Sequence, residues 1–562
     1  MSGKNQSTFV RQSDGTANVA QNFVRALQQE ATMDSAAGAE IVAGSGYPAA
    51  AKLAEALPTV KRGSGEFTGG QVVAQAVLDG VQEFERRNGF SPNGGLIHTA
   101  LQSAFGLFGS EHAAAIQGNG VAAFDSAAVL AGASTGSMVT NAAQLAIFTS
   151  IASAIPFGGY VPMDKGMSGK LIIGGHRAGS ETGSYDIGSR LNGVDGGKVF
   201  MSNLRAVKAE SSDQTNFTAT VKYADGDSAG CRIVPNTAKV FVNGLIACQA
   251  AVNLDRATTR ELRLAGGSTL KVSGVNKEYG ITATINVETG VATIVANPAL
   301  PAGAEIHFEA GVDYEDPRMK DKRPVVEAYA SAYDIVAHTH SGTYRVTNEA
   351  DTQWRVELGQ SYEMQATLAL RNQSTNERHF KAVHDMYRIG KGRKYEYDLK
   401  ADSRLGDRSR SSLFEDAFIT IAQADQDMIE TTGEFGIGVL YVGSKGKAYL
   451  SSLPEPTFIP SGIRGGAGIH RFGTLKGIPV YYIPNTFAES ANGFEMLAIG
   501  RSDQIGFNPY IIGDVTGAVI ERVPQAFDMT KGATYFHSMV NQVNPNQQIA
   551  SAAAVITFKN PH

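Results

Sequence analysis

The residues most suggestive of chemistry form the string Gly132-Ala-Ser134-Thr-Gly136, which matches the pattern G-x-S-x-G. In hydrolases this pattern places the serine on a sharp turn between a strand and a helix, where a histidine can activate it. Residues 127–131 offer a strand and residues 137–148 a helix. Gly, Ala and Ser are so abundant here, however, that the pattern arises easily by chance, and no acid followed by a histidine stands in a persuasive setting downstream. We therefore favour a structural reading of Ser134 over a nucleophile.

Two histidine pairs have spacings that invite a test for zinc. His379 and His384 lie five residues apart and miss the four-residue spacing that puts two zinc ligands on one helix face. His338 and His340 lie two residues apart, which in a strand places both on one face. Surface or core histidines are the commoner explanation of both pairs, and His537 stands alone. The sequence predicts no metal-ligating residues.

Two further segments have the composition of anion-binding sites. The string GSKGKA at residues 443–448 lacks both the glycine spacing of a phosphate-binding loop and the Ser or Thr after its lysine. The segment Arg388–Lys400 is basic and has Tyr395 and Tyr397 among its cations, as nucleic-acid-binding surfaces do. A solvated loop, or a salt-bridge surface between subunits, is the favoured explanation of that segment. With no catalytic, cofactor or metal site assembled, the sequence predicts a protein that is not an enzyme and has no cofactor.

Bulk composition narrows the class of protein. The chain has 562 residues, which predicts two or three domains. Its 63 glycines exceed the usual share of about 7% and predict many turns, bulges and long loops. The net charge of −5 and the pI of about 6.2 give no global cationic surface for nucleic acid.

The two cysteines and the N-terminal sequence suggest a cytosolic origin. Cys231 and Cys248 are too few for a disulfide framework and lack a C-x-x-C pair, so we expect free thiols, with a bridge left open if two strands align them. Residues 1–22 show no secretion signal, and the best apolar run, 145–157, is too short and polar for a membrane span and is broken at Pro156. Secretion and membrane insertion are not expected.

The first two regions of the chain differ in composition and in the spacing of their apolar residues. Residues 1–143 are rich in small residues and contain short helical patches such as Gln71–Arg87, where valines recur at helical spacing. In residues 144–214, a helical run ends at Pro156 and two extended stretches follow, Lys170–Gly174 and Lys198–Leu204. The polar, Gly-rich segment between these stretches predicts a projecting hairpin.

Residues 215–312 show the alternation of an all-β domain. Turn signals such as Asn243-Gly244 separate about seven short strands, the profile of an Ig-like β-sandwich. More helical sequence flanks this stretch on both sides, which indicates an inserted domain. The expected strands are Phe217–Tyr223, Lys239–Leu245, Glu261–Leu264, Thr269–Val272, Ile281–Val287, Ala292–Val295 and Glu305–Phe308.

Residues 313–562 return to a mixture of helices and strands. An apolar stripe at helical spacing predicts a helix over Ser411–Thr432, which Gly433 should end. Further helices are expected at Glu357–Arg371 and His379–Ile389, and strands at Gly436–Val442, Ile478–Ile483, Glu495–Gly500 and Val519–Val523.

The last 150 residues resemble the shell proteins of tailed bacteriophages, the family with the Hong Kong 97-like fold. The order and spacing of several strings carry the resemblance, although each alone is weak. These strings are the helix Leu413–Glu430, the strand and small-residue turn Gly438–Ser444, the short helix Ala448–Leu453, the strand Phe472–Tyr482, and the segments Met496–Gly500 and Gly506–Tyr510.

The resemblance implies an α+β fold with an N-terminal arm, an extended hairpin called the E-loop, a peripheral domain with a spine helix, and an axial domain. Residues 160–205 would then hold the E-loop and residues 353–389 the spine helix. The expected domains are 1–143, an arm or extension of uncertain fold; 144–214, the end of the arm and the E-loop; 215–312, the Ig-like insertion; and 313–562, the peripheral and axial domains. Residues 1–143 match nothing in the family clearly, and a removable scaffolding segment remains an alternative for them.

The resemblance also implies a function. The chain would be a major capsid protein that self-assembles as hexamers and pentamers into an icosahedral shell, in the virion, after assembly in the bacterial cytoplasm. Expected partners are further copies of the chain, then portal, scaffold and decoration proteins, with packaged double-stranded DNA contacted weakly and no membrane. The alternatives are another virion component, such as a tail or sheath protein, and a Ser134-dependent hydrolase.

Overall fold

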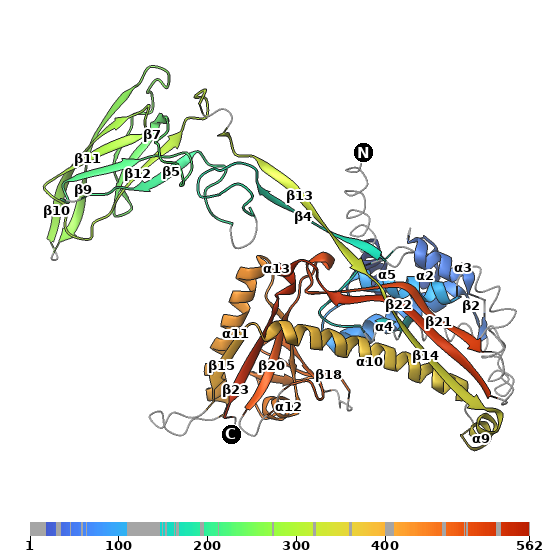
Figure 1. The fold of residues 1–562 in the computed structure, drawn as a ribbon. Coiled ribbons are helices and arrows are strands. Elements are labelled where there is room, and N and C mark those ends of the chain that lie inside the picture. The colour runs from blue at the N-terminus through green and yellow to red at the C-terminus, as the bar shows by residue number, and fades with distance from the viewer. Residues whose placement is uncertain are drawn as a thin grey trace. The chain divides into compact units, whose positions relative to one another are not determined.

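The computed structural model of the chain divides it into two compact units (Figure 1). One unit comprises Met1–Ile173 and Ser331–His562, and the other comprises Gly174–Ala330. We call them the discontinuous unit and the inserted unit. The residues that the structure describes are 18–29, 35–44, 47–57, 60–62, 65–108, 147–148, 150–151, 154–161, 163, 168–191, 196–211, 213–272, 275–318, 322–358, 362–399, 410–462, 468–487, 489, 493–523 and 530–560.

The inserted unit contains two four-stranded antiparallel sheets around one apolar core. The first sheet has the order β6-β11-β10-β9, with strands at Asn216–Thr220, Val291–Asn297, Val275–Asn286 and Glu261–Val272. The second has the order β5-β12-β7-β8, with strands at Leu204–Lys208, Ile306–Val312, Ile233–Val242 and Leu245–Gln249.

Alternating side chains form this core, as the sequence pattern predicted. In β11, Ala292, Ile294 and Ala296 are buried and the residues between them face outward. Asn243 and Gly244 both take positive φ, +47° and +82°, as a two-residue hairpin turn requires, and so divide the predicted strand Lys239–Leu245 between β7 and β8. The predicted strands at 261–264 and 269–272 are one continuous strand, and β5 joins the sandwich from before residue 215.

The predicted hairpin within residues 160–205 is wrong in its pairing. Strand β4, Ser168–Ala178, pairs with β13, Val326–Val336, in a separate two-stranded sheet. Residues 198–201 form bends instead of a returning strand, and Leu204 begins β5. The polar segment between them has its own small core of Ala178, Tyr185 and Phe200. The strand that completes the pair therefore comes from beyond the sandwich, about 150 residues later, which local spacing gives no means of finding.

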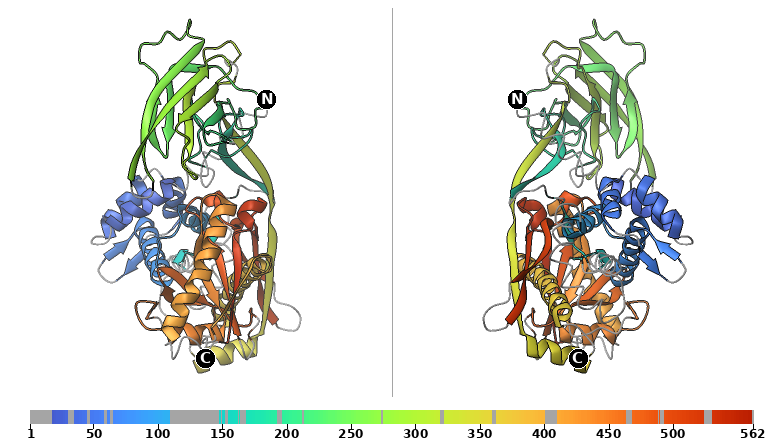
Figure 2. Two further views of the ribbon diagram at one scale, coloured as in Figure 1. Left: turned by 90° about the vertical axis from the view of Figure 1, so that its left-hand side faces the viewer. Right: turned by 90° about the vertical axis from the view of Figure 1, so that its right-hand side faces the viewer.

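The N-terminal region of the discontinuous unit is helical in its described parts. Residues 18–29 are helical, and helices follow at α2 Ser35–Gly44, α3 Pro48–Ala56, α4 Gly69–Asn88 and α5 Gly94–Phe108, with the short pair β1 Val60–Arg62 and β2 Gly65–Phe67 between them. These helices, blue in Figure 2, form one group. Helix α4 covers the predicted patch Gln71–Arg87 and is capped by Thr68, whose hydroxyl accepts the backbone N–H of Gln71.

Two sheets form the rest of the discontinuous unit. The four-stranded sheet has the order β14-β22-β21-β3, with strands at His338–Thr347, Thr530–Val543, Tyr510–Val523 and Gly158–Tyr160. The seven-stranded sheet has the order β15-β23-β20-β16-β19-β18-β17, with strands at Lys394–Asp398, Ala553–Lys559, Gly493–Gly500, Ile437–Val442, Ile478–Tyr482, His470–Leu475 and Phe458–Pro460. Three pairs, β3/β21, β15/β23 and β16/β19, are parallel.

Helices pack against these sheets. Helix α9, Asn348–Leu358, holds the start of the predicted helix Glu357–Arg371. Helix α10, Tyr362–Gly390, has 29 residues and joins the rest of that helix to the predicted His379–Ile389 (Figure 1). Helix α11, Arg410–Thr432, agrees with the predicted Ser411–Thr432 and ends at Gly433, which has a φ of +81°. Short helices follow at α12 Ser444–Ser451, η4 Ile505–Phe507 and α13 Gln547–Ala550. No helix in the described ranges is long and apolar enough to cross a membrane.

The N-terminal helices share their core with the two sheets. Buried Val73, Val77 and Leu101 belong to the same apolar cluster as Tyr441 and Ile512 of the sheets. Tyr481 donates its hydroxyl to Asn88 Oδ1 at 2.5 Å, and Asn93 Nδ2 donates to the Asp503 carbonyl at 3.4 Å. This region is therefore an integral layer of the discontinuous unit rather than a loose extension.

Candidate functional site

Ser134 lies outside the described residues, as do Lys400 and the sequence that follows it to residue 409. The structure therefore leaves the hydrolase alternative where the sequence left it.

The predicted histidine pairs are placed differently from one another. His338 and His340 lie on one face of β14, as expected, with ring centroids 5.3 Å apart. His379 and His384 do not come together: His379 Nε2 lies 3.0 Å from the Tyr441 hydroxyl, and the His384 side chain is exposed. Among the described residues, no group of three or more His, Cys, Asp or Glu side chains is positioned to hold a metal ion.

The GSKGKA segment begins helix α12, and an internal carboxylate already occupies its N-terminus. Glu489 accepts the Lys445 backbone N–H at 2.8 Å and the Ser444 hydroxyl at 2.6 Å. Lys447 instead points to His470, whose Nε2 is 2.9 Å from its Nζ, and lies 4.7 Å from the centre of the Tyr482 ring. Burial lowers the pKa of Lys447. This arrangement stabilises the helix and leaves no open phosphate cradle there.

The described part of the basic segment makes contacts within the chain. Arg388 pairs with Asp385 at 2.6 Å, and Lys391 Nζ lies 4.5 Å from the centre of the Tyr387 ring. Arg393 donates to the Thr431 hydroxyl at 2.9 Å. These cations therefore make contacts within the chain that stabilise the end of α10 and the residues after it, as a structural role of the segment requires.

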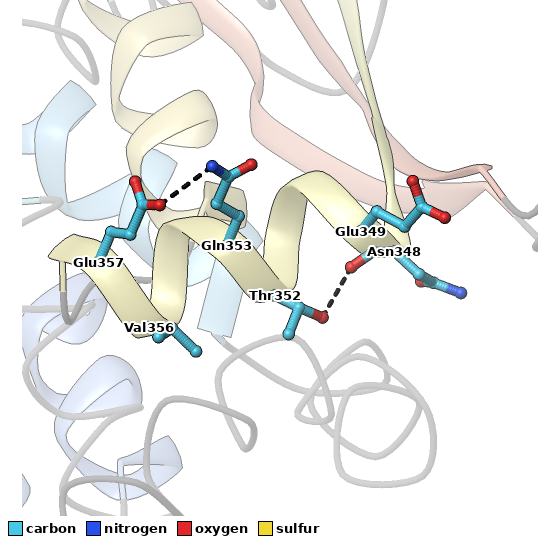
Figure 3. Close-up of a pocket in the computed structure, with 6 residues that line it drawn as sticks. All are labelled: Asn348, Glu349, Thr352, Gln353, Val356 and Glu357. Carbon is cyan, nitrogen blue, oxygen red and sulfur yellow. Dashed lines mark hydrogen bonds between the residues drawn. The ribbon is translucent and has the colours of Figure 1, made fainter.

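The one hollow that we describe lies along α9 (Figure 3). Its volume is about 520 Å³, and all of its lining residues come from that single helix: Asn348, Glu349, Thr352, Gln353, Val356 and Glu357. Gln353 donates to Glu357 at 3.0 Å, and Val356 is 79% exposed. Within the described ranges, no second element contributes a facing group, and the lining there lacks the convergent polar groups of a substrate site.

Strands β4 and β13 form a separate two-stranded sheet, which we call the ribbon. Nearly all of β13 is exposed or half-buried on both faces, and Ile335 is its one fully buried side chain. Arg177 and Glu327 form an ion pair across the ribbon at 3.1 Å, and Arg177 also lies over the Tyr329 ring at 5.9 Å.

A two-stranded sheet with no covered face is marginally stable in water. In the ribbon, Leu171, Ile173 and Ile335 pack in a core at one end, and most of the rest of β13 is uncovered. Exposed Val326 and Val336, at 51% and 60%, add apolar surface that the described chain leaves uncovered. The ribbon is held within the chain at both ends: Gly179 donates its N–H to the Val325 carbonyl at 2.7 Å, and β13 continues after Ala337 into β14 of the four-stranded sheet. Such a ribbon is suited to lie on another surface.

Solved structures that match this chain include structures from bacteriophages, among them a capsid, and an encapsulin. A structure from Mycobacterium phage Che8 matches with a TM-score of 0.27 at 15% identity, over 54% of this chain and 85% of that one. The capsid of the jumbo bacteriophage PhiKZ matches with a TM-score of 0.31 at 10% identity, over 70% and 89%. An encapsulin complex from Synechococcus elongatus matches with a TM-score of 0.26 at 10% identity, over 42% and 78%.

With TM-scores of 0.31 or less, these structural likenesses are slight. No protein-family model matches the sequence, and a search of curated proteins finds no match.

Sequence reasoning missed two features of the structure. It did not find β13 as the partner of β4, because about 150 residues separate them. It also treated His537 as isolated, although β22 places His537 directly opposite His340 of β14. No local pattern links residues 340 and 537, so only the sheet topology reveals the pair.

Proposed function

We propose that this chain is the major capsid protein of a tailed bacteriophage, a shell subunit with the Hong Kong 97-like fold. The ribbon carries the proposal: Leu171, Ile173 and Ile335 anchor one end of it in a core, while most of β13 stays exposed and is well suited to lying across a neighbouring copy. In the terms of that fold, the ribbon corresponds to the E-loop, α10 to the spine helix, and the seven-stranded sheet with α11 to the axial domain.

The inserted unit has the role of an accessory domain in this proposal. Its two four-stranded antiparallel sheets around one core support an Ig-like classification. The two sheets of this unit lie in the chain between β4 and β13, so the sandwich follows one strand of the ribbon and precedes the other. We expect it on the outside of the shell, since a sandwich on the inner face would crowd the DNA, and surface proteolysis of intact particles tests this.

The proposal also covers partners and location. Copies of the chain assemble as hexamers and pentamers in the bacterial cytoplasm and remain in the virion, with portal, scaffold and decoration proteins as further partners. A net charge of −5 supports weak, non-specific contact with packaged DNA. The proposed role is structural and involves no catalysis.

Exposed residues of the ribbon allow a direct test. Replacing Val326 and Val336 by Lys places two charges where we propose that a neighbouring subunit covers the ribbon. Both side chains are largely exposed in the single chain, so the fold and the unfolding midpoint should stay close to those of the wild type. We expect the double variant to remain as small oligomers where the wild type forms large particles, measured by sedimentation velocity.

A matched control is Val252→Lys, at an 82% exposed valine of the inserted unit outside the ribbon. This control should sediment like the wild type. If the ribbon variant assembles as well as Val252→Lys, the ribbon is not the intersubunit contact.

A further inference from the structure

Helix α10 is fastened to the sheets by polar contacts as well as by apolar packing. The Ser374 hydroxyl lies 2.9 Å from His340 Nδ1 of β14, and Arg378 donates to Asp514 Oδ1 of β21 at 3.3 Å. Ser374 and Arg378 are both more than 90% buried. On another side of the helix, His379 Nε2 meets the Tyr441 hydroxyl of β16. Two of these three contacts include a histidine ring.

Three histidines gather where α10 meets the four-stranded sheet. The His338 and His340 rings lie 5.3 Å apart, and His537 is the direct cross-strand neighbour of His340. His537 Nε2 lies 3.3 Å from Asp514 Oδ1, and the Tyr535 hydroxyl lies 3.4 Å from His537 Nδ1. His338 Nε2 is buried without a hydrogen-bond partner among the described residues. We call His338, His340 and His537 the histidine cluster.

The charged groups around the cluster are already paired. From α10, Arg378 binds Asp514, and Lys381 binds Asp385 at 2.7 Å and the Asn541 carbonyl at 3.1 Å. Glu377 of α10 accepts from Gln373 at 2.9 Å and faces solvent. Three phenols of the described residues also lie nearby: Tyr510 of β21, Tyr535 of β22, and Tyr160 of β3, whose ring centre lies 5.9 Å from the Arg378 guanidinium.

A proton added to the cluster therefore arrives in an unfavourable place. On His338 or His340 the proton is close to the cations Arg378 and Lys381 and to a second histidine, whereas the Asp514 carboxylate contacts Arg378 and His537. Burial, Lys381 and His537 lower the pKa of His338, and burial, His338 and His537 lower the pKa of His340. Burial and Arg378 lower the pKa of His379 to about 3.

We propose that the histidine cluster is a proton-sensitive fastening that holds α10 on the β14-β22-β21 sheet at neutral pH and loosens it in mild acid. In the unfolded chain, His338 and His340 take up protons as the pH falls below about 6.5, while in the folded chain their lowered pKa values resist protonation. Stability is therefore fully present above that pH and declines below it. The decline approaches a factor of about ten in the folding equilibrium for each such histidine and each pH unit. This inference is independent of the proposed function.

Hydrogen–deuterium exchange on the full chain at about pH 7.5 and about pH 5.5 tests the proposal, with rates corrected for the intrinsic effect of pH. Amides of α10 should lose protection by roughly tenfold or more in acid, and those of α11 should change little. The double variant His338→Gln, His340→Asn removes two titrating rings while keeping amide groups able to hydrogen-bond. Its α10 should lose clearly less protection, and the loss that remains is assigned to His379, whose pKa is lowered by burial and Arg378.

The control is His176→Gln, which removes an exposed histidine of β4 outside the cluster and should behave as the wild type does. Equal losses of protection in α10 and α11 of the wild type would overturn the proposal, and this comparison needs no variant to fold. An unchanged acid response in a folded double variant would also overturn it.

Discussion

The two units of this protein are built on opposite plans. In the inserted unit, the pairs β7/β8, β9/β10 and β10/β11 join strands that follow one another directly in the chain. In the discontinuous unit, Gly158–Tyr160 pairs with a strand that begins at Tyr510, and Lys394–Asp398 pairs with the last strand of the chain. The inserted unit is built within one continuous stretch of chain, although β5/β12, β6/β11 and β7/β12 pair across it. The discontinuous unit brings together segments that are hundreds of residues apart.

This difference in chain path indicates which segments each unit needs in order to fold. A unit made from consecutive antiparallel strands carries its own core and can be removed or transplanted. A unit whose core combines Val77 near the N-terminus, Tyr441 and Val555 near the C-terminus requires all of its segments at once. The inserted unit should therefore be dispensable for the stability of the discontinuous unit, whereas the N-terminal helices should not.

The largest expected effect comes from two deletions of similar length. Deleting residues 1–108 removes the helices that bury one side of the shared core, so we expect the discontinuous unit not to fold. Replacing residues 204–312 by a short Gly-Ser linker should leave that unit folded, because the Val312 N–H donates to the Asn203 carbonyl at 2.8 Å and the two ends already meet. Circular dichroism and thermal unfolding measure both outcomes.

The comparison between the units would break if the N-terminal deletion left a cooperatively folded unit, or if removal of the sandwich abolished folding. The first result would also favour a removable N-terminal segment, the alternative that the sequence left open.

A smaller effect is expected from Asp313→Asn, confined to the inserted unit. The Asp313 carboxylate is 3% exposed and binds Arg256, Arg232 at 3.2 Å, and the Glu315 backbone N–H at 2.9 Å. Loss of its charge leaves two arginines without their buried partner and should cost about 3 kcal/mol in the free energy of unfolding. Glu315→Gln, at an exposed carboxylate that pairs with the same Arg256, should cost less than about 1 kcal/mol.

The cost of Asp313→Asn should shrink in acid, so that the two variants differ most at neutral pH. Burial disfavours the charged form of Asp313, but the hydrogen bonds from Arg256 and the Glu315 backbone outweigh it and lower its pKa. Its stabilisation is therefore present above the unfolded value near 3.9 and lost as the pH falls through the lower folded value. Denaturant unfolding of the inserted unit between neutral and acid pH measures this, and an equal cost of both substitutions would contradict the assigned network.

The smallest effect concerns the turn that divides β7 from β8. Gly244 has a φ of +82° with no atom near its missing Cβ, so Gly244→Ala meets backbone strain alone and should destabilise the inserted unit by about 1 kcal/mol. Gly468 is equally open but has no positive φ, so Gly468→Ala should be neutral or slightly stabilising. Gly244→Ala should lower the unfolding midpoint of the inserted unit. Gly468→Ala should leave the midpoint of the discontinuous unit unchanged or raise it slightly.

The same contrast explains what the sequence predicted. The strands of the sandwich follow from alternation and from turns such as Asn243-Gly244, because both are local, and α11 follows from its apolar stripe and Gly433. The pairing of β4 with β13 could not be predicted, because it depends on a domain folding between them. For this reason the predicted returning strand at 198–204 was wrong. The sequence offered the nearest extended segment as the partner of β4, whereas the actual partner, β13, follows the sandwich.

The candidate functional features also divide into those set by local sequence and those set by contacts remote in sequence. The placement of His338 and His340 on one face was confirmed, because a strand's period of two determines it. Their partners Ser374 and His537 come from a helix and a strand remote in sequence, and no spacing predicts them. The ribbon, which carries the proposed function, is visible in the sequence as one strand only.

The most direct test of the proposed shell function is electron microscopy of the purified full-length protein under assembly conditions. The account predicts closed shells, or their hexameric and pentameric parts. A protein that stays monomeric at every concentration, or that forms a single ring or a helical tail-like tube, would contradict it.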